Sequence, residues 1–345
     1  MLPPREGFST ASVGAIGLLV QRLARAAGGE VVGRPVEQPF AGIPFHPVRP
    51  GWGLRDTSRY ARGAAAVLRR IGPDLIEVHN RPEVALLLAQ RFRRVALFLH
   101  NDPQGMRAAR TGAERAILLR KLARVVTVSD YLRGRFLDGI AGDVTVLPNS
   151  IDVPPRPRKV RDQLILFVGR MVHDKGADAF VDACALALPD LPGWRAEMIG
   201  ADRFSATAPA TPFTELTRRR AAAAGVILRG HLPHADAMER MSRAAIAVVP
   251  SRWPEPFGLA ALEAMAYGAA LVCSHRGALP EVAADCAVYA SPDTPGAIAA
   301  AVLDLARNPN RRGVLARAAS DRAAAWFGTA LAAERLRALR MELAG

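Results

Sequence analysis

Residues 164–187, which read LILFVGRMVHDKGADAFVDACALA, combine three kinds of local structure in a row. The first six letters are almost wholly apolar, as expected for a strand buried on both faces of a parallel sheet. A turn with glycines and cations follows, and from Ala177 to Ala187 the apolar residues recur at helical spacing. A strand that passes through a short turn into a helix is the repeating unit of doubly wound α/β folds.

Similar apolar runs occur along the whole chain and alternate with helical stretches. Helices are predicted at 16–27, 63–71, 114–123, 236–243, 258–267 and 331–343. The predicted strands are residues 74–79, 94–100, 124–129, 144–149, 164–169, 195–200, 226–230, 245–250 and 270–274. This alternation predicts an α/β fold, and a length of 345 residues is typical of two such domains.

The two predicted domains meet at residues 151–162, IDVPPRPRKVRD, with prolines at positions 154, 155 and 157. Because proline cannot continue a helix or a central strand, we interpret this segment as a semi-rigid linker. Ligands of open α/β sheets bind beyond the carboxyl ends of the strands, so two Rossmann-like domains would face one another across a cleft. Only Met1 and Leu2 precede the loop at residues 7–15, so we expect the first strand to be truncated or the chain to begin late.

Composition excludes several classes of protein. Half of the residues are hydrophobic and the mean hydropathy is +0.09, which argues against disorder. The sequence has neither an apolar run of membrane-spanning length nor an export signal, so we expect a cytoplasmic protein. Cys184, Cys273 and Cys286 are too scattered for a disulfide framework or a zinc site and are predicted to be buried.

The formal net charge is +14, and residues 1–150 hold 22 Lys or Arg against 12 Asp or Glu. An excess of this kind favours an anionic partner, such as membrane lipid, a lipid-linked phosphate or nucleic acid. An arginine-rich composition without any such partner is the alternative.

The turn within residues 164–187 carries Gly169, Arg170, Lys175 and Gly176. Glycine lets a ligand approach the backbone, and the helix that follows offers free N–H groups and the positive end of its dipole. Two cations at such a helix start suit a diphosphate group, although a surface turn with solvated cations is the alternative. The sequence lacks both G-x-x-x-x-G-K-[ST] and G-x-G-x-x-G, which disfavours nucleotide hydrolysis and dinucleotide binding.

A second turn, EPFGLAALE at residues 255–263, places two acids around a predicted helix start. A residue before proline is pushed out of helical space, so Glu255 should lie in a loop. Glu263 falls about one and a half turns into a helix that begins near Phe257 or Gly258. Because the first N–H groups of a helix lack intrahelical partners, those of Phe257, Gly258 and Leu259 can bind an anion. A loop acid followed by an exposed helical glutamate is the simpler alternative.

Taken together, these motifs resemble the retaining, nucleotide-sugar-dependent glycosyltransferases of the bacterial cell-envelope and polysaccharide type, which have the two-Rossmann GT-B fold and a Glu-x7-Glu signature. The combination of E-P-F-G-x4-E with an upstream G-R-x4-K-G is specific, whereas neither motif is specific alone. The resemblance covers nearly the whole chain and rests on residues 125–136, 146–152, 166–183, 230–253 and 255–282.

The resemblance implies a role for individual residues. Glu255 would hydrogen-bond the donor sugar, and Glu263 would hold the ribose hydroxyls. Arg170 and Lys175 would stabilise the leaving diphosphate as its negative charge develops. His100 resembles the histidine that touches the transferred sugar, although an incidental loop histidine is the alternative, as it is for His79. The other implied donor contacts are Gly14, Gly169, Gly200, Gly230, His231, Leu232, Phe257, Gly258 and Leu259.

The implied reaction is transfer of a sugar with retention of configuration, by same-face attack in which the departing phosphate oxygen takes the acceptor proton. The sequence contains no Asp-x-Asp pair, the metal-binding motif of the other large glycosyltransferase fold. We therefore expect no metal and no cofactor, with the nucleotide-sugar as co-substrate. In this family a terminal helix packs back on the first domain, so the expected divisions are 1–153, 154–325 and 326–345.

The implied acceptor is a glycan or lipid-linked saccharide of lipopolysaccharide, capsule or exopolysaccharide synthesis. Residues around the helix predicted at 114–123 combine three leucines with six cations: Arg107, Arg110, Arg115, Arg120, Lys121 and Arg124. Such a surface suits peripheral binding to the anionic inner face of a membrane, although a solvated cationic face is the alternative.

Two other functions stay open at this point. A GT-B enzyme with a soluble substrate, such as a sugar-nucleotide epimerase or a sugar-phosphate synthase, would use the same diphosphate site. A non-catalytic nucleotide-binding or nucleic-acid-binding protein would explain the charge, but it would leave the paired glutamates without a purpose. Nucleic acid is therefore not expected as a partner.

Overall fold

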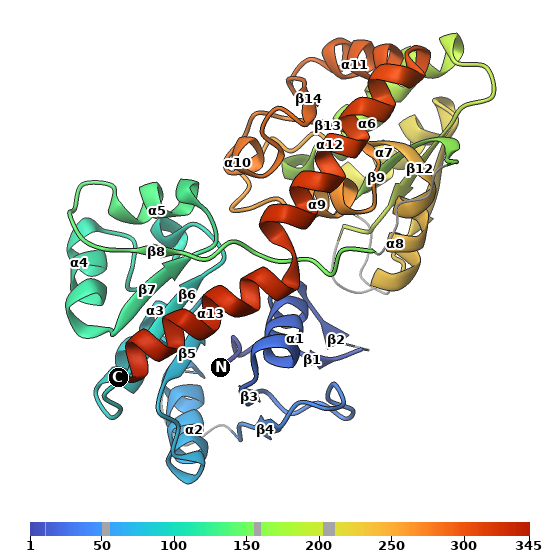
Figure 1. Cartoon of the computed structure of the whole chain (residues 1–345). Coiled ribbons are helices and arrows are strands. Elements are labelled where there is room, and N and C mark those ends of the chain that lie inside the picture. Colours follow the sequence, from blue (N-terminus) through green and yellow to red (C-terminus); the bar gives the residue numbers. More distant parts are fainter. Residues whose placement is uncertain (11, 50–55, 155–159, 203–210) are drawn as a thin grey trace. The chain divides into compact units, whose positions relative to one another are not determined.

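The computed structural model describes the whole chain except residues 11, 50–55, 155–159 and 203–210. The chain folds into two compact units: residues 1–152 with 327–345 form the first, and residues 153–326 form the second. Pro155 and Pro157 of the predicted linker lie outside the described residues. The two-Rossmann α/β architecture predicted from the alternating pattern is confirmed, since both units carry parallel sheets with helices on both faces (Figure 1).

The first unit is built on a parallel sheet of order β5-β6-β7-β8, with a separate parallel pair β3-β4. Its strands are β1 Phe8–Ser9, β2 Ser12–Val13, β3 Val31–Gly33, β4 Phe45–Pro47, β5 Ile76–His79, β6 Val95–Leu99, β7 Arg124–Thr127 and β8 Thr145–Val146. Its helices are α1 Ala15–Ala27, α2 Asp56–Ile71, α3 Pro82–Ala89, η1 Pro103–Gly105, α4 Gly112–Lys121, α5 Asp130–Leu137 and α13 Thr329–Ala344.

The first two residues fill the position where we expected a missing strand. The amino group of Met1 donates to the Glu77 carbonyl of β5 at 2.6 Å, and the carbonyl of Met1 accepts from the His79 amide at 3.1 Å. On the other side, the Leu2 amide donates to the Val32 carbonyl of β3 at 2.8 Å. Met1 and Leu2 thus join β3 to β5 with strand-like hydrogen bonds, and both side chains are buried.

Helices α1 and α13 pack on one face of this sheet (Figure 1). Leu19 and Leu23 of α1 and Leu336 of α13 belong to one buried apolar cluster with Phe98 of β6. Arg340 of α13 also binds the Glu77 carboxylate with two hydrogen bonds of 2.7 and 2.9 Å. The opposite face is covered by α2, α3 and α4.

Part of the cationic surface predicted around residues 107–124 does not exist. The Arg115 side chain is 3 % exposed and donates to the carbonyls of Phe136, Ala109, Arg110 and Asp138. Arg124 is paired with Asp143 and Glu342. These two arginines hold segments of the protein together, which a charge count along the sequence does not reveal. The exposed cations that remain are Arg107, Arg110, Arg120 and Lys121.

The second unit is a six-stranded parallel sheet of order β11-β10-β9-β12-β13-β14. Its strands are β9 Asp162–Val168, β10 Arg195–Ile199, β11 Val226–Gly230, β12 Ala244–Val249, β13 Ala270–Cys273 and β14 Ala287–Tyr289. Its helices are η2 His173–Lys175, α6 Ala177–Ala187, η3 Leu188–Asp190, α7 Pro212–Ala223, α8 His234–Arg243, α9 Leu259–Ala266, α10 Leu279–Ala283, α11 Pro295–Arg307 and α12 Pro309–Phe327.

Strands β9 and β12 are neighbours in the sheet. The loops that follow them carry Lys175 and Glu255, which are 80 residues apart in the sequence. Helices α6 and α11 cover one face of the sheet, while α8 and α9 pack against the other. All three cysteines are buried and free. Because the strands are parallel, the loops after β9, β10, β11 and β12 emerge at the same edge of the sheet, and these loops carry the predicted donor residues.

Candidate active site

The turn after β9 places Lys175 against the loop after β12. Lys175 is the last residue of η2, and its Nζ lies 2.6 Å from Oε1 of Glu255. The Glu255 carboxylate is buried, 6 % exposed as a residue, and the Ser251 hydroxyl donates to the same oxygen at 2.6 Å. Lys175 and Glu255, which the family resemblance links to different parts of a donor, therefore form one ion pair.

Gly176 explains how the two loops approach so closely. It adopts a left-handed conformation with φ of 68°, and a Cβ atom there would lie 1.9 Å from the carbonyl oxygen of Pro250. Both the conformation and the contact exclude other residues without a shift of the backbone. Helix α6 begins at the next residue, Ala177, so its first N–H groups lie beside Lys175.

Three of the predicted glycines lie side by side at the ends of neighbouring strands. The Gly169 amide donates to the Ile199 carbonyl at 3.0 Å, and the Gly200 amide donates to the Gly230 carbonyl at 2.8 Å. A Cβ atom on Gly200 would lie 1.8 Å from the Gly169 carbonyl oxygen, and its φ of 137° also demands glycine. His231 and Leu232 follow directly in the loop after β11, and Arg170 is exposed at the end of β9.

The second glutamate is held by a different partner. Helix α9 begins at Leu259 with Gly258 as its N-cap, close to the predicted start, and Phe257 is buried just before it. Glu263 lies on this helix, and its Oε1 is 2.8 Å from Nε2 of His234, the first residue of α8. The two acids are thus engaged separately, Glu255 by Lys175 and Ser251, and Glu263 by His234.

In the first unit, Gly14 is the N-cap of α1. The Glu6 carboxylate occupies this helix start, since its Oε1 accepts from the amides of Gly14 at 2.8 Å and Gly17 at 2.9 Å. An acid at a helix N-terminus satisfies N–H groups that lack intrahelical partners. The amide of Gly14 therefore already has an anionic partner within its own unit.

His100 and His79 form a buried pair at the ends of β6 and β5. The His79 Nδ1 lies 2.9 Å from the His100 Nε2, so one ring must donate and the other accept. The Asn80 side-chain oxygen accepts from the amides of His100 and Asn101 and fixes this end of the sheet. Burial lowers the pKa of His100 to about 4. Burial, followed by the charge of the amino terminus, holds the pKa of His79 well below its usual value.

Comparison with known proteins adds to this geometry. Residues 151–322 match the family model described as glycosyl transferases group 1, and residues 19–154 match the model of Glycosyltransferase Family 4. The solved structure of Anabaena HepE in complex with UDP and glucose superposes with a TM-score of 0.76 at 16 % identity, over 99 % of this chain and 98 % of that one. Both models describe glycosyltransferases, and together they span residues 19–322 of a chain that has the GT-B fold.

Two curated relatives match this chain in part. Glycogen synthase of Mycobacterium tuberculosis is 33 % identical over 216 residues, which cover 57 % of this chain and 47 % of the relative. The lipopolysaccharide core biosynthesis mannosyltransferase LpsB of Rhizobium meliloti is 36 % identical over 118 residues, which cover 33 % of this chain and 32 % of the relative. The chain thus spans about half or less of the length of these relatives.

Several contacts of the predicted site residues could not be predicted from the sequence. Ser251, His234 and Glu6 each touch a predicted site residue. His234 and Ser251 lie within residues 230–253, which carry the family resemblance, but the sequence assigns neither of them a contact. Among the described residues, no group of three His, Cys, Asp or Glu side chains is placed to hold a metal ion. No helix in the described part of the chain is long and apolar enough to cross a membrane.

The buried histidines predict how stability depends on pH. An unfolded histidine binds a proton with a pKa near 6.5, whereas folded His100 stays neutral down to about pH 4. Between these values the unfolded state holds more protons, so the free energy of unfolding should fall by about 1.4 kcal/mol per pH unit for this residue as the pH decreases. Urea unfolding at pH 5, 6 and 7 measures the slope. His100→Gln should flatten it, and equal slopes in variant and wild type would contradict the assignment.

Proposed function

We propose that the protein transfers a sugar from a nucleoside-diphosphate donor to a glycan or lipid-linked acceptor, with retention of anomeric configuration. The observation that supports this most is the Lys175–Glu255 pair at the start of α6, because it sets a cation suited to a diphosphate 2.6 Å from an acid suited to a sugar hydroxyl. Within the described part of the chain, the contacts to Glu255 fall on Oε1, so Oε2 is available to a sugar hydroxyl.

The donor then lies along the carboxyl edge of the second sheet. Lys175, Arg170 and the first amides of α6 and α9 bind the diphosphate, where their positive charge stabilises the leaving group. Glu263 receives the ribose hydroxyls with the oxygen that His234 does not engage. The base lies near Gly200 and residues 230–232. The family resemblance also assigns a sugar contact to His100, which burial keeps unprotonated at pH 7.

Acceptor and pathway are proposed from the curated relatives. The names of LpsB and of LpcC from Rhizobium leguminosarum, 32 % identical over 181 residues, refer to mannosyl transfer in lipopolysaccharide core biosynthesis. We infer that this protein acts in lipopolysaccharide, capsule or exopolysaccharide synthesis, without a metal or cofactor, in the cytoplasm or on the inner face of the membrane. The exposed cations Arg107, Arg110, Arg120 and Lys121 are candidates for a contact with anionic lipid.

A donor screen tests the proposal. UDP, GDP and ADP and their glucose, mannose and N-acetylglucosamine derivatives are added to the full chain, and the thermal midpoint is recorded with and without EDTA. One nucleoside diphosphate should raise the midpoint, and its sugar should be consumed when lipid-linked or free saccharides are supplied, at the same rate in EDTA. Loss of turnover in EDTA would overturn metal independence. No binding of any donor would overturn the proposed function, and turnover with soluble sugar phosphates alone would favour a soluble-substrate enzyme.

A further inference from the structure

The Arg252 side chain joins three separate segments around the Lys175–Glu255 pair. Its two terminal nitrogens bind both carboxylate oxygens of Asp178, in the first turn of α6, at 2.7 and 3.1 Å. The same nitrogens donate to the carbonyl of His173 in η2 at 3.1 Å and to that of Pro292, before α11, at 3.3 Å. Arg252 and Asp178 are each only 18 % exposed as side chains.

The backbone around Arg252 continues this connection. The carbonyl oxygen of Asp174 accepts from the amides of Arg252 and Trp253, both at 2.9 Å, and lies 3.2 Å from the hydroxyl oxygen of Ser251. These contacts lie next to both members of the ion pair, because Asp174 immediately precedes Lys175 and Ser251 binds Glu255. The turn after β9 and the loop after β12 are therefore joined at the backbone and by one guanidinium group.

Arg252 keeps its positive charge, so its hydrogen bonds to the two loops persist. Burial acts against its charged form, but the hydrogen bonds and charges of Asp178 and Asp293 together outweigh it and raise the pKa of Arg252. A planar guanidinium can serve a carboxylate with two hydrogen bonds and neighbouring carbonyls at the same time, whereas the single ammonium of lysine cannot. Arg252 is thus matched to its set of four acceptor groups, which also includes the Asp293 carboxylate at 3.3 Å.

We propose that Arg252, through its pair with Asp178, is a positioning residue that holds Lys175 and Glu255 at their working separation. Arg252 itself contacts neither of the two side chains. It fixes the backbone on both sides of them, so that the cation for the diphosphate and the acid for the sugar meet one donor at once. This inference deepens the proposed function and rests on it for its effect on catalysis.

Arg252→Lys tests the inference, with Arg220→Lys as the matched control. Arg220 pairs with Asp182, one turn along the same helix α6, at 3.2 Å, and both side chains are more than a third exposed. Misplaced catalytic groups cost about 10- to 100-fold in rate, so Arg252→Lys should lower kcat by that factor. Its Kd for the nucleoside diphosphate should change by less than about threefold, because Lys175 keeps its charge. Arg220→Lys should change neither value.

A double-variant cycle separates positioning from a general loss of structure. If Arg252 acts through Lys175, Arg252→Lys should cost less than about threefold in kcat once Lys175→Ala is already present. Equal losses in both backgrounds would show a merely structural role and overturn the inference. So would an unchanged kcat in the single variant.

Amide hydrogen exchange supplies a measurement that does not depend on turnover. Arg252→Lys should speed exchange in peptides covering residues 171–178 and 250–255, whereas Arg220→Lys should leave both unchanged. If the wild type consumes no donor, the proposed function fails. Unchanged hydrogen exchange in Arg252→Lys would separately refute the inference that Arg252 holds the two loops together. If exchange does rise without any donor being consumed, the positioning of catalytic groups is refuted and only a structural tie between the loops remains.

Discussion

Glu255→Ala should lower kcat for sugar transfer by about 10²–10³-fold and leave the affinity for the free nucleoside diphosphate within about threefold. The carboxylate is buried and binds through Oε1 to both Lys175 and Ser251. Its removal takes away the proposed sugar contact and frees Lys175 to bind phosphate. The loss should therefore appear in turnover and not in product binding.

Steady-state kinetics with the donor found in the screen, together with calorimetric titration of its nucleoside diphosphate, measure the two effects. Glu255→Gln keeps the size of the side chain and its contact with Ser251 but removes the charge. If the charge carries the effect, this variant should be as slow as Glu255→Ala. Glu215→Ala, which removes an exposed acid from the first turn of α7, serves as the control and should be as active as wild type. Normal turnover in Glu255→Ala would refute the role of this acid.

The elements that sequence predicted best are those whose signal is local. Helix α6 begins and ends at Ala177 and Ala187 as predicted, because an apolar face repeats at helical spacing between Gly176 and the short helix η3 that carries Pro189. Strands β9 and β12 are buried on both faces and stand out as apolar runs. In contrast, β3, β4 and β14 have three residues each, too few to carry a pattern.

The pairings within the site could not be predicted in the same way. The sequence places Lys175 and Glu255 at the ends of two strands, but their contact depends on β9 lying next to β12, and a sheet order is not written in any local pattern. The contact of His234 with Glu263 likewise depends on α8 lying beside α9. The roles of these residues toward a donor remain predictions from the family resemblance.

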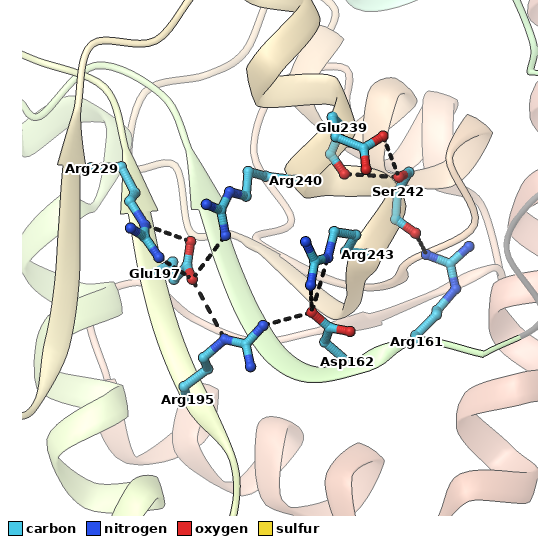
Figure 2. A network of polar contacts seen from close by, with 9 residues as sticks. All are labelled: Arg161, Asp162, Arg195, Glu197, Arg229, Glu239, Arg240, Ser242 and Arg243. Atoms are coloured by element: carbon cyan, nitrogen blue, oxygen red, sulfur yellow. Dashed lines mark hydrogen bonds and ion pairs between the residues drawn. The ribbon is translucent and has the colours of Figure 1, made fainter.

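Glu197 is expected to be the acid on which the stability of the second unit depends most. It lies in the middle of β10 and is fully buried, surrounded by Arg229, Arg195 and Arg240 (Figure 2). Arg229 binds both of its oxygens at 2.8 and 2.9 Å. This hydrogen bond lowers the pKa of Glu197 even though burial acts in the opposite direction. Glu197 is thus the shared counter-charge of three arginines. Asp162 is the counter-charge of Arg243 and a second one for Arg195.

Glu197→Ala should lower the free energy of unfolding of the second unit by about 3 kcal/mol, the lower end of the range for breaking a buried ion pair. The lower end applies because the arginines are 31–40 % exposed and can regain some water. Glu239→Ala, an exposed position on α8 in the same view, should cost less than about 0.5 kcal/mol. Denaturant unfolding followed by tryptophan fluorescence compares the stabilities of the two variants. Equal losses in both would contradict the special importance of Glu197.

Acid unfolding separates the charge of Glu197 from its packing. Because the folded pKa lies below the unfolded value of 4.5, the stability that Glu197 contributes is complete above pH 4.5 and is lost as the pH falls through the folded pKa. Glu197→Gln fills nearly the same space but cannot titrate, so it should be destabilised at pH 7 and should lose less additional stability than wild type below pH 4.5. Parallel stability curves for wild type and Glu197→Gln across this range would show that shape, and not charge, is what β10 requires at this position.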